Sequence, residues 1–237
     1  MIKRLFNRND NIAILIAGIF SIIIGLGVAR FAFTGLIPAM LDDYLTIKFV
    51  GILASLNFAG YLSGSIFSIF VKDINFKVYL YRFGIFLAIS TTFILAYSDN
   101  NTLWMIGRVL AGFAGAMCLI VGTSIVMQKL TIKSKTKAMG IHFSGIGFSI
   151  LTTDLLARFV LSLNYSWRDS WAVLALFAII LSFYSVYILS FDKEVKQNAV
   201  KVKFDISIFT PFVIVLIIAY FTEGVGFVVQ ATFLPDI

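Results

Sequence analysis

Residues 11–41 form an almost wholly apolar stretch of the chain, and Arg30 is the only charged residue within it. A helix that spans a bilayer needs about 20 mostly apolar residues, so this stretch is long enough to cross a membrane. Its hydrophobicity is continuous, whereas the strands of a membrane barrel are short and alternate between apolar and polar residues. The stretch therefore predicts a transmembrane helix and raises the question of why it contains an arginine.

Six further apolar segments follow, separated by short polar connections. Overall, 60% of the residues are hydrophobic and 13% are charged, compared with about 45–50% and 25% in soluble domains. Both values predict an all-α integral membrane protein that has the lipid bilayer as a partner. The predicted helices are residues 12–41, 48–71, 78–97, 102–128, 138–162, 170–191 and 208–235.

The lysines and arginines predict the orientation of the chain in the membrane. Fourteen of them fall on the side of the N-terminus and two, Lys48 and Arg168, fall on the other. Basic residues favour the cytoplasmic side, so we expect a multi-pass protein of the plasma (cell inner) membrane with a cytoplasmic N-terminus. The first apolar run is far longer than the core of a signal peptide, which predicts a retained helix. Three basic residues remain inside the predicted spans: Arg30, Arg108 and Arg158.

Several functions are excluded or disfavoured by composition. The chain has one cysteine, Cys118, and one histidine, His142, so it predicts no disulfide, no metal site and no cofactor. It lacks a phosphate-binding loop for ATP-driven pumping and the grouped carboxylates, serines or histidines of an intramembrane enzyme. The net charge of +7 is explained by membrane orientation, and no nucleic-acid partner is expected. A seven-helix receptor would have its N-terminus outside.

An internal repeat links the first and last predicted helices. "EGVGFVVQATFLPDI" aligns with "GLGVARFAFTGLIPAM" when Pro235 is placed on Pro38, which also puts Gly224 on Gly27. Both segments start from the same side, and parallel repeats of this kind occur in transporters built from two halves. We therefore expect a six-helix bundle over residues 1–191, a cytoplasmic linker over 192–207, and the first helix of an incomplete second bundle over 208–237. A separate or missing second half would then be a partner.

The sequence resembles the N-terminal half, plus helix seven, of a major facilitator superfamily transporter of the YbfB/YjiJ type. The resemblance is carried by the two repeat strings and by "NFAGYLSG", "GRVLAGFAGA", "GIHFSGIGFSI" and "SWRDSWAVLA". It implies a secondary transporter that moves a small solute by alternating access, and it implies a role in proton coupling for Arg108. The superfamily signature between helices two and three is not kept: Gly64, Lys72, Asp73 and Lys77 do not have its spacing.

Candidate site residues are the polar groups inside the predicted spans. Arg30 either extends to the outer interface or faces an internal cavity, and we favour the cavity because intramembrane charges usually mark functional sites. Asp154 and Arg158 are four residues apart on one helix face and are predicted to pair, either for packing or for solute binding. Arg30 and Arg108 together suggest an anionic solute.

The remaining candidates are more ambiguous. Glu223 is the one acidic residue inside the last predicted helix, which makes it a candidate proton carrier or a partner for an arginine such as Arg30. Asn57 and Gln230 could bind solute or join helices through hydrogen bonds. His142 is predicted to be an interfacial residue without a ligand role. Close helix contacts are expected at Gly60, Gly64, Gly145 and Gly147, and Pro38 and Pro235 are expected to end or kink their helices.

The leading interpretation is a secondary transporter that is coupled to protons. The alternatives are a truncated half-transporter without activity of its own and a membrane protein with another role.

Overall fold

The computed structural model describes residues 6–41, 43–131, 135–190 and 210–233, with backbone only for 224–233, and these residues form helices and turns. The chain divides into two compact units, residues 1–196 and 197–237, which are described separately. Six helices of the first unit are long and apolar enough to cross a membrane. The predicted all-α membrane fold is therefore confirmed.

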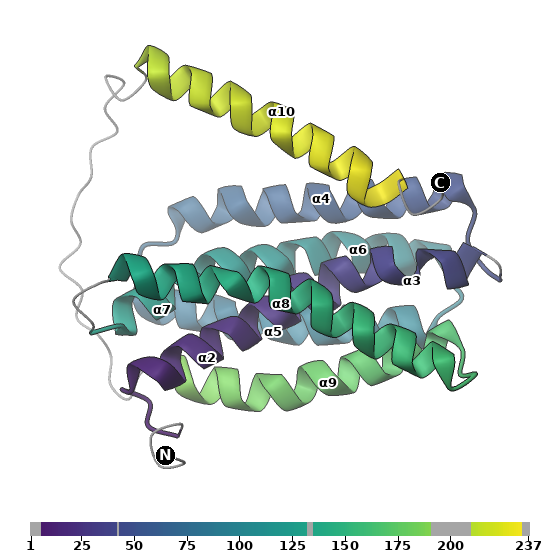
Figure 1. Cartoon of the computed structure of the whole chain (residues 1–237), viewed down its shortest axis with the longest axis horizontal. Coiled ribbons are helices and arrows are strands. Elements are labelled where there is room, and N and C mark those ends of the chain that lie inside the picture. The colour runs from purple at the N-terminus through teal and green to yellow at the C-terminus, as the bar shows by residue number, and fades with distance from the viewer. Residues whose placement is uncertain (1–5, 42, 132–134, 191–209, 234–237) are drawn as a thin grey trace. The chain divides into compact units, whose positions relative to one another are not determined.

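The first helix crosses the centre of the first unit. It consists of α2 (Asn11–Ile22), a π-helical segment η1 (Ile23–Phe31) and α3 (Ala32–Leu41), and we call this continuous element helix 1. It is the most deeply buried of the six spans. Figure 1 shows helix 1 running obliquely through the bundle, with α8 in front of it and α5 behind. Pro38 lies inside α3, which ends three residues later at Leu41.

Five further helices complete the unit. The fourth span consists of α6 (Asn101–Ala116), a second π-helical segment η2 (Met117–Val121) and α7 (Gly122–Lys129), and we call it helix 4. The other elements are α4 (Ile47–Phe70), α5 (Ile74–Tyr97), α8 (Lys135–Ser162) and α9 (Trp167–Ile188).

The helices of the first unit begin one to four residues earlier than hydropathy alone predicted, and polar residues cap several of them. Asp73 accepts a hydrogen bond from the backbone N–H of Phe76 and starts α5. Asn100 caps α6, and Ser166 and Asp169 form a reciprocal capping box at the start of α9. Such caps satisfy backbone N–H groups that have no partner within the helix. The largest error is four residues, at α5, where the prediction started at residue 78.

The six spans are arranged in two layers. In one layer α4 packs against helix 4, helix 4 against helix 1, and helix 1 against α8. In the other layer α5 and α9 lie side by side, and both contact helix 1. Helix 1 therefore has neighbours on three sides, while α4 and α8 form the edges of their layer and expose many apolar side chains.

Glycines bring α4 and α6 into backbone contact. A methyl group added at Gly60 of α4 would lie 2.0 Å from the carbonyl oxygen of Val109. In return, a methyl group at Gly112 of α6 would lie 1.9 Å from the carbonyl oxygen of Asn57. The close contact predicted for Gly60 is confirmed, and Gly64 likewise approaches Ala116. Small residues let membrane helices approach in this way.

The two glycines of α8 behave differently from each other. A methyl group added at Gly145 would lie 3.3 Å from Ile19 Cα of helix 1, as expected for a helix contact. Gly147 has no atom within 4 Å of the position a Cβ would take, so the predicted close contact is wrong for Gly147 within the described part of the chain. It lies on the exposed edge of the layer because α8 packs through its other face.

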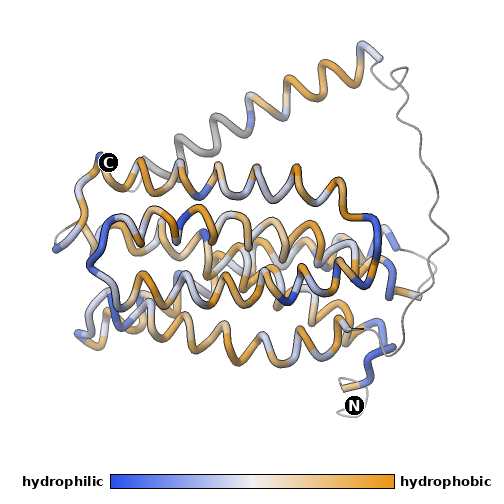
Figure 2. The backbone as a smooth tube through the Cα atoms, turned by 180° about the vertical axis from the view of Figure 1, so that it is seen from behind, coloured by the Kyte–Doolittle hydropathy of each residue, from blue (hydrophilic) through white to orange (hydrophobic). Residues whose placement is uncertain are grey.

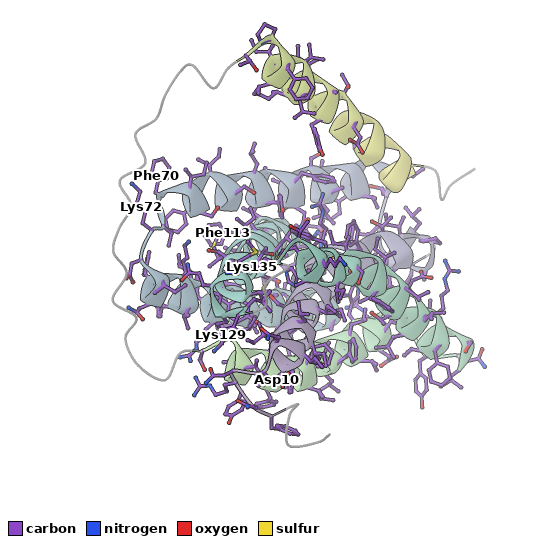
Figure 3. The ribbon with its side chains drawn as sticks, turned by 60° about the vertical axis from the view of Figure 1, so that its left-hand side comes forward. Asp10, Phe70, Lys72, Phe113, Lys129 and Lys135 are labelled. Atoms are coloured by element: carbon purple, nitrogen blue, oxygen red, sulfur yellow. The ribbon has the colours of Figure 1, made fainter. Side chains whose placement is uncertain are left out.

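The two ends of the bundle differ in chemistry. Hydrophilic residues gather at the helix ends, as Figure 2 shows. The end that carries the N-terminus, here called the basic end, includes Lys72, Lys129 and Lys135, which Figure 3 labels together with Asp10. Lys129 there donates to the carbonyl oxygen of Ser190 at 2.6 Å.

The opposite end is aromatic. The rings of Tyr44, Trp104 and Trp167 pack together, with centroids 5.2–5.9 Å apart. Arg168 pairs with Asp99 beside them. Tryptophan and tyrosine are enriched where membranes meet water, so this cluster is typical of an interfacial belt.

The second unit contributes one helix, α10 (Pro211–Phe233). The predicted linker over 192–207 and Pro235 lie outside the described residues.

The α4–α6 contact predicts a large effect for one added methyl group. We expect Gly112→Ala to destabilise the bundle by about 1–3 kcal/mol, because overpacking forces the backbones apart. The apparent melting temperature in detergent, followed by size-exclusion chromatography, measures the effect. Gly147→Ala is the matched control, since nothing occupies that space, and equal melting temperatures for the two variants would contradict the prediction.

Candidate functional site

The π-helical segment η1 places the first candidate residue. At its end the backbone N–H of Ala32 bonds to the carbonyl of Gly27, five residues earlier, instead of the usual four. Wide turns of this kind are rare and frequently occur at functional sites. Gly25 and Gly27 lie within η1, and methyl groups there would lie 2.3 Å from Cys118 Cβ and 3.0 Å from the Ser149 carbonyl oxygen. The wide turn is therefore held between helix 4 and α8.

The π-helical segment of helix 4 meets η1 at the crossing of the two helices. Two buried hydrogen bonds connect the two helices here, one donated by helix 1 and one donated by helix 4. Ser21 Oγ of helix 1 donates to the carbonyl of Cys118 in η2 at 2.9 Å. Arg108 Nη1 of helix 4 donates to the carbonyl of Ala29 in η1 at 3.0 Å. Each helix thus supplies a side-chain donor to a carbonyl in the π-helical segment of the other.

Arg108 is fully enclosed in this crossing, with 2% of its surface exposed. Its guanidinium carbon lies 4.3 Å from the centre of the Phe33 ring, a cation–π distance. Its Nε atom is buried and has no hydrogen-bond partner among the described residues. This burial excludes extension of Arg108 to the membrane surface.

Arg30 lies next to the carbonyl that Arg108 binds, since it follows Ala29 in the chain. Its guanidinium carbon is 4.5 Å from the ring centre of Phe58 and 5.0 Å from that of Tyr61, both on α4. The side chain is only partly exposed. Arg30 therefore reaches across helix 4 toward α4 within the same layer of helices, and it does not extend along helix 1 to the outer end.

The two arginines form a positively charged pair. Arg108 donates to the carbonyl of Ala29, and Arg30 is the next residue of the chain. Among the described residues, no carboxylate lies within 4.0 Å of either guanidinium. Aromatic faces supply part of the missing stabilisation, but they leave the net charge uncompensated. An anion placed beside Arg30 would compensate this charge.

Asn57 of α4 lies beside the same crossing, and its side chain contacts helix 4. It is buried, and its Nδ2 donates to the carbonyl of Arg108 at 3.1 Å. This bond joins α4 to α6 beside the Gly60 and Gly112 contacts. The geometry favours the helix-joining interpretation of Asn57 over direct solute binding.

Asp154 and Arg158 lie on the other flank of helix 1. Arg158 Nε and Asp154 Oδ2 are 2.7 Å apart, so the predicted pairing is confirmed. A methyl group at Gly35 of helix 1 would lie 3.0 Å from Asp154 Oδ1. The arginine side chain is 69% exposed and the aspartate side chain 35%. Asp154 therefore lies close to helix 1 at Gly35, and Arg158 faces outward.

The last two candidates belong to the second unit. Glu223 lies on α10 with an exposed side chain. Gln230 lies within the same helix, and only its backbone is described. The structure thus brings together Arg30, Arg108 and Asn57, and separately Asp154 and Arg158, while Glu223 and Gln230 stay predictions.

One buried polar residue was placed wrongly by sequence reasoning. His142, predicted to be interfacial, is 1% exposed and lies between helix 1 and helix 4. The sequence signal that could have found it is Gly18, which lies at the depth of His142 and leaves room for its ring. In the described part of the chain, no three His, Cys, Asp or Glu side chains are grouped to hold a metal ion.

The model of a protein family described as "Uncharacterised MFS-type transporter YbfB" matches residues 22–237. The match covers most of the chain, including both repeat strings. The chain belongs to this family of MFS-type transporters. A comparison with curated proteins gave no match.

Membership confirms the resemblance inferred from the motifs, and it supports a multi-pass membrane transporter that acts on a small solute. It also favours a transporter over an enzyme. Among the described residues, the layer formed by α4, helix 4, helix 1 and α8 contains Arg30, Arg108 and the Asp154–Arg158 pair.

Arg108 has no carboxylate partner among the described residues. We therefore expect the folded transporter to become more stable when the charge of Arg108 is removed. Met fills a similar volume without a charge, so Arg108→Met should stabilise the transporter by about 1–3 kcal/mol, as when other buried charges are replaced by apolar side chains. The apparent melting temperature in detergent measures this gain. Arg82→Met, at an exposed position of α5, is the matched control and should change it little. A fall for Arg108→Met would show instead that its bond to Ala29 holds helix 1 in place.

Proposed function

We propose that this protein is a secondary transporter that moves a small anionic solute by alternating access and is coupled to protons. The observation that carries the proposal is the Arg30–Arg108 pair at the crossing of helices 1 and 4. Two guanidinium groups lie there with no carboxylate near them among the described residues. Intramembrane charges are costly to insert, at about 2.5–3.5 kcal/mol each on insertion scales, so uncompensated ones favour a functional explanation.

Arg30 is the better of the two arginines for direct solute contact. Arg108 is enclosed, and its Nη1 is already bonded to Ala29, so it acts on the solute through its field and through the shape of η1. Arg30 is partly exposed and contacts ring faces of α4. A guanidinium binds a carboxylate with two parallel hydrogen bonds, and the rings of Phe58 and Tyr61 would flank the solute.

Proton coupling rests on the acidic residues and on the family. Asp154 is held by Arg158, and exchange of this partner during transport would couple its charge to the movement of helix 1. Glu223 and Gln230 on α10 are the candidates of the second unit, with Glu223 as proton carrier. In this proposal residues 1–191 form the first bundle, 192–207 the linker, and 208–237 the start of a second bundle.

The proposed orientation of the bundle in the membrane follows from the distribution of its lysines and arginines. The basic end of the bundle faces the cytoplasm, and the aromatic end of Tyr44, Trp104 and Trp167 faces outward. This placement agrees with the positive-inside rule for a bacterial-type inner membrane. It places Arg30 and Arg108 in the outer half of the membrane, where a solute would meet the partly exposed Arg30 first.

Uptake assays on the complete gene product in proteoliposomes test the proposal. The probes are radiolabelled benzoate and succinate, with benzamide and succinamide as neutral counterparts. We expect uptake of a carboxylate, and not of its amide, to be faster with an imposed pH gradient. Equal uptake with and without the gradient would refute proton coupling, and uptake of neither anion would refute the solute class tested.

Arg30→Gln should lower kcat/KM for the transported anion by about 10–100-fold. This corresponds to the loss of a charged hydrogen bond worth about 1.5–3 kcal/mol. Arg30→Lys keeps the charge without the planar fork and should retain part of the activity. Lys48→Gln, at an exposed position at the start of α4, is the control. Unchanged kinetics in Arg30→Gln would exclude Arg30 from the solute site.

A further inference from the structure

His142 occupies a closed position in the half of the bundle that adjoins the basic end. It is the only histidine in the sequence. It lies seven residues after the start of α8 at Lys135, and its neighbour Gly18 lies seven residues after the start of α2 at Asn11. Both positions correspond to a depth of about 10 Å from the helix starts. Neither arginine site uses this residue.

The imidazole ring has one hydrogen-bond partner. Its Nε2 lies 2.9 Å from Thr123 Oγ1 of α7. Its Nδ1 is buried and has no partner among the described residues. A methyl group at Gly18 would lie 2.6 Å from this Nδ1, so helix 1 covers the unpartnered nitrogen directly with its backbone.

The contacts printed for the ring are uncharged. Helix 1 presents Gly18, α7 presents the Thr123 hydroxyl, and α8 presents the Phe143 ring with its centroid 5.4 Å away. A methyl of Val126 on α7 lies beside the same face of Gly18.

The charged groups on these elements lie at their ends or further along them. On α8, Lys135 and Lys137 lie seven and five residues before His142, and Asp154 and Arg158 lie at least twelve residues after it. On helix 1, Asp10 caps α2 and Arg30 lies twelve residues after Gly18. On helix 4, Lys129 lies six residues after Thr123 and Arg108 lies fifteen residues before it.

We propose that His142 is a proton-binding site of the transporter and that it takes its proton only when helix 1 moves away from α8 at Gly18. This inference rests on the proposed function, since it names a residue for the proton coupling proposed there. A neutral imidazole needs one donor contact, and Thr123 can satisfy it. An imidazolium has two N–H donors, and the second, on Nδ1, would point at Gly18 without an acceptor.

The proton comes from water that enters from the basic end, and it binds to the lone pair of Nδ1. The closed arrangement of Gly18 and His142 therefore holds the unprotonated ring, and the open arrangement holds the protonated one. A ligand shifts a two-state equilibrium toward the state that binds it better. Acidification thus favours opening of the helix 1–α8 contact at this end, which links proton binding to alternating access without a carboxylate.

Cys118 reports movement of helix 1 itself, because Gly25 of that helix covers Cys118 and a shift of helix 1 disturbs this contact. It is the only cysteine in the sequence, is 1% exposed, and packs against Gly25 of helix 1. The experiment measures the rate of N-ethylmaleimide labelling of Cys118 in lipid nanodiscs at about pH 5.5 and about pH 7.5, a range that spans the ordinary titration of histidine. Each rate is divided by that of the SDS-denatured chain at the same pH, which removes the pH dependence of the thiol itself.

In the wild type we expect the normalised rate to rise on acidification, by at most about tenfold per pH unit for one linked proton. His142→Gln keeps a donor for Thr123 and cannot bind a proton, so its normalised rate should not depend on pH. Ser144→Ala, at an exposed position of α8, is the matched control and should behave as the wild type. Imidazole ¹⁵N chemical shifts of the single histidine, measured over the same pH range, report its protonation directly.

Three results would overturn the inference: a wild-type rate that does not change with pH, a His142→Gln rate that rises as the wild type does, or nitrogen shifts that stay those of a neutral ring. None of these measurements needs a solute. The three results would therefore contradict the role of His142 as the proton-binding site without contradicting anion transport. Uptake that is independent of a pH gradient instead overturns the proton coupling of the proposed function, and with it a role for His142 in transport.

Discussion

The backbone contact of helix 4 with its neighbours on both sides is the constraint on which the first unit depends. On one side Gly60 of α4 faces a carbonyl of α6 and Gly112 of α6 faces a carbonyl of α4, and on the other side Gly25 brings helix 1 against Cys118. Van der Waals packing of this kind drives association where lipid is as apolar as the side chains. With so little space between the helices, only a few side chains can enter the crossing, and Arg108 is one of them.

This tight packing explains where the charges lie. Arg108 extends along the crossing to the Ala29 carbonyl, and Arg30 turns toward α4 to contact Phe58 and Tyr61. On the opposite flank, the missing side chain at Gly35 leaves room for Asp154. Helix 1 therefore separates a cationic region on the side of α4 from an ion pair on the side of α8, and movement of this one helix would affect both.

Hydropathy predicted each span within a few residues, because a bilayer demands long apolar helices and lipid offers no alternative. Gly60 and the Asp154–Arg158 pair were also predictable, since both depend on local helix spacing. The start of α5 was missed because the cap Asp73 is polar. The burial of His142 was missed because it depends on Gly18, more than a hundred residues away, and a glycine alone does not indicate which distant side chain it leaves room for.

The two π-helical segments have a consequence for how this chain can vary. A π-turn contains one residue more than the α-helical turn that it replaces. Removing a single residue from Ile23–Phe31 could therefore be absorbed by conversion of η1 to α-helix, with both flanking helices keeping the faces that they now present. The same removal within α4, which has no such reserve, would rotate Gly64 relative to Asn57 and break the contact with α6. Length changes in this bundle are thus tolerated unequally, and helix 1 and helix 4 are the two places where they can be accommodated.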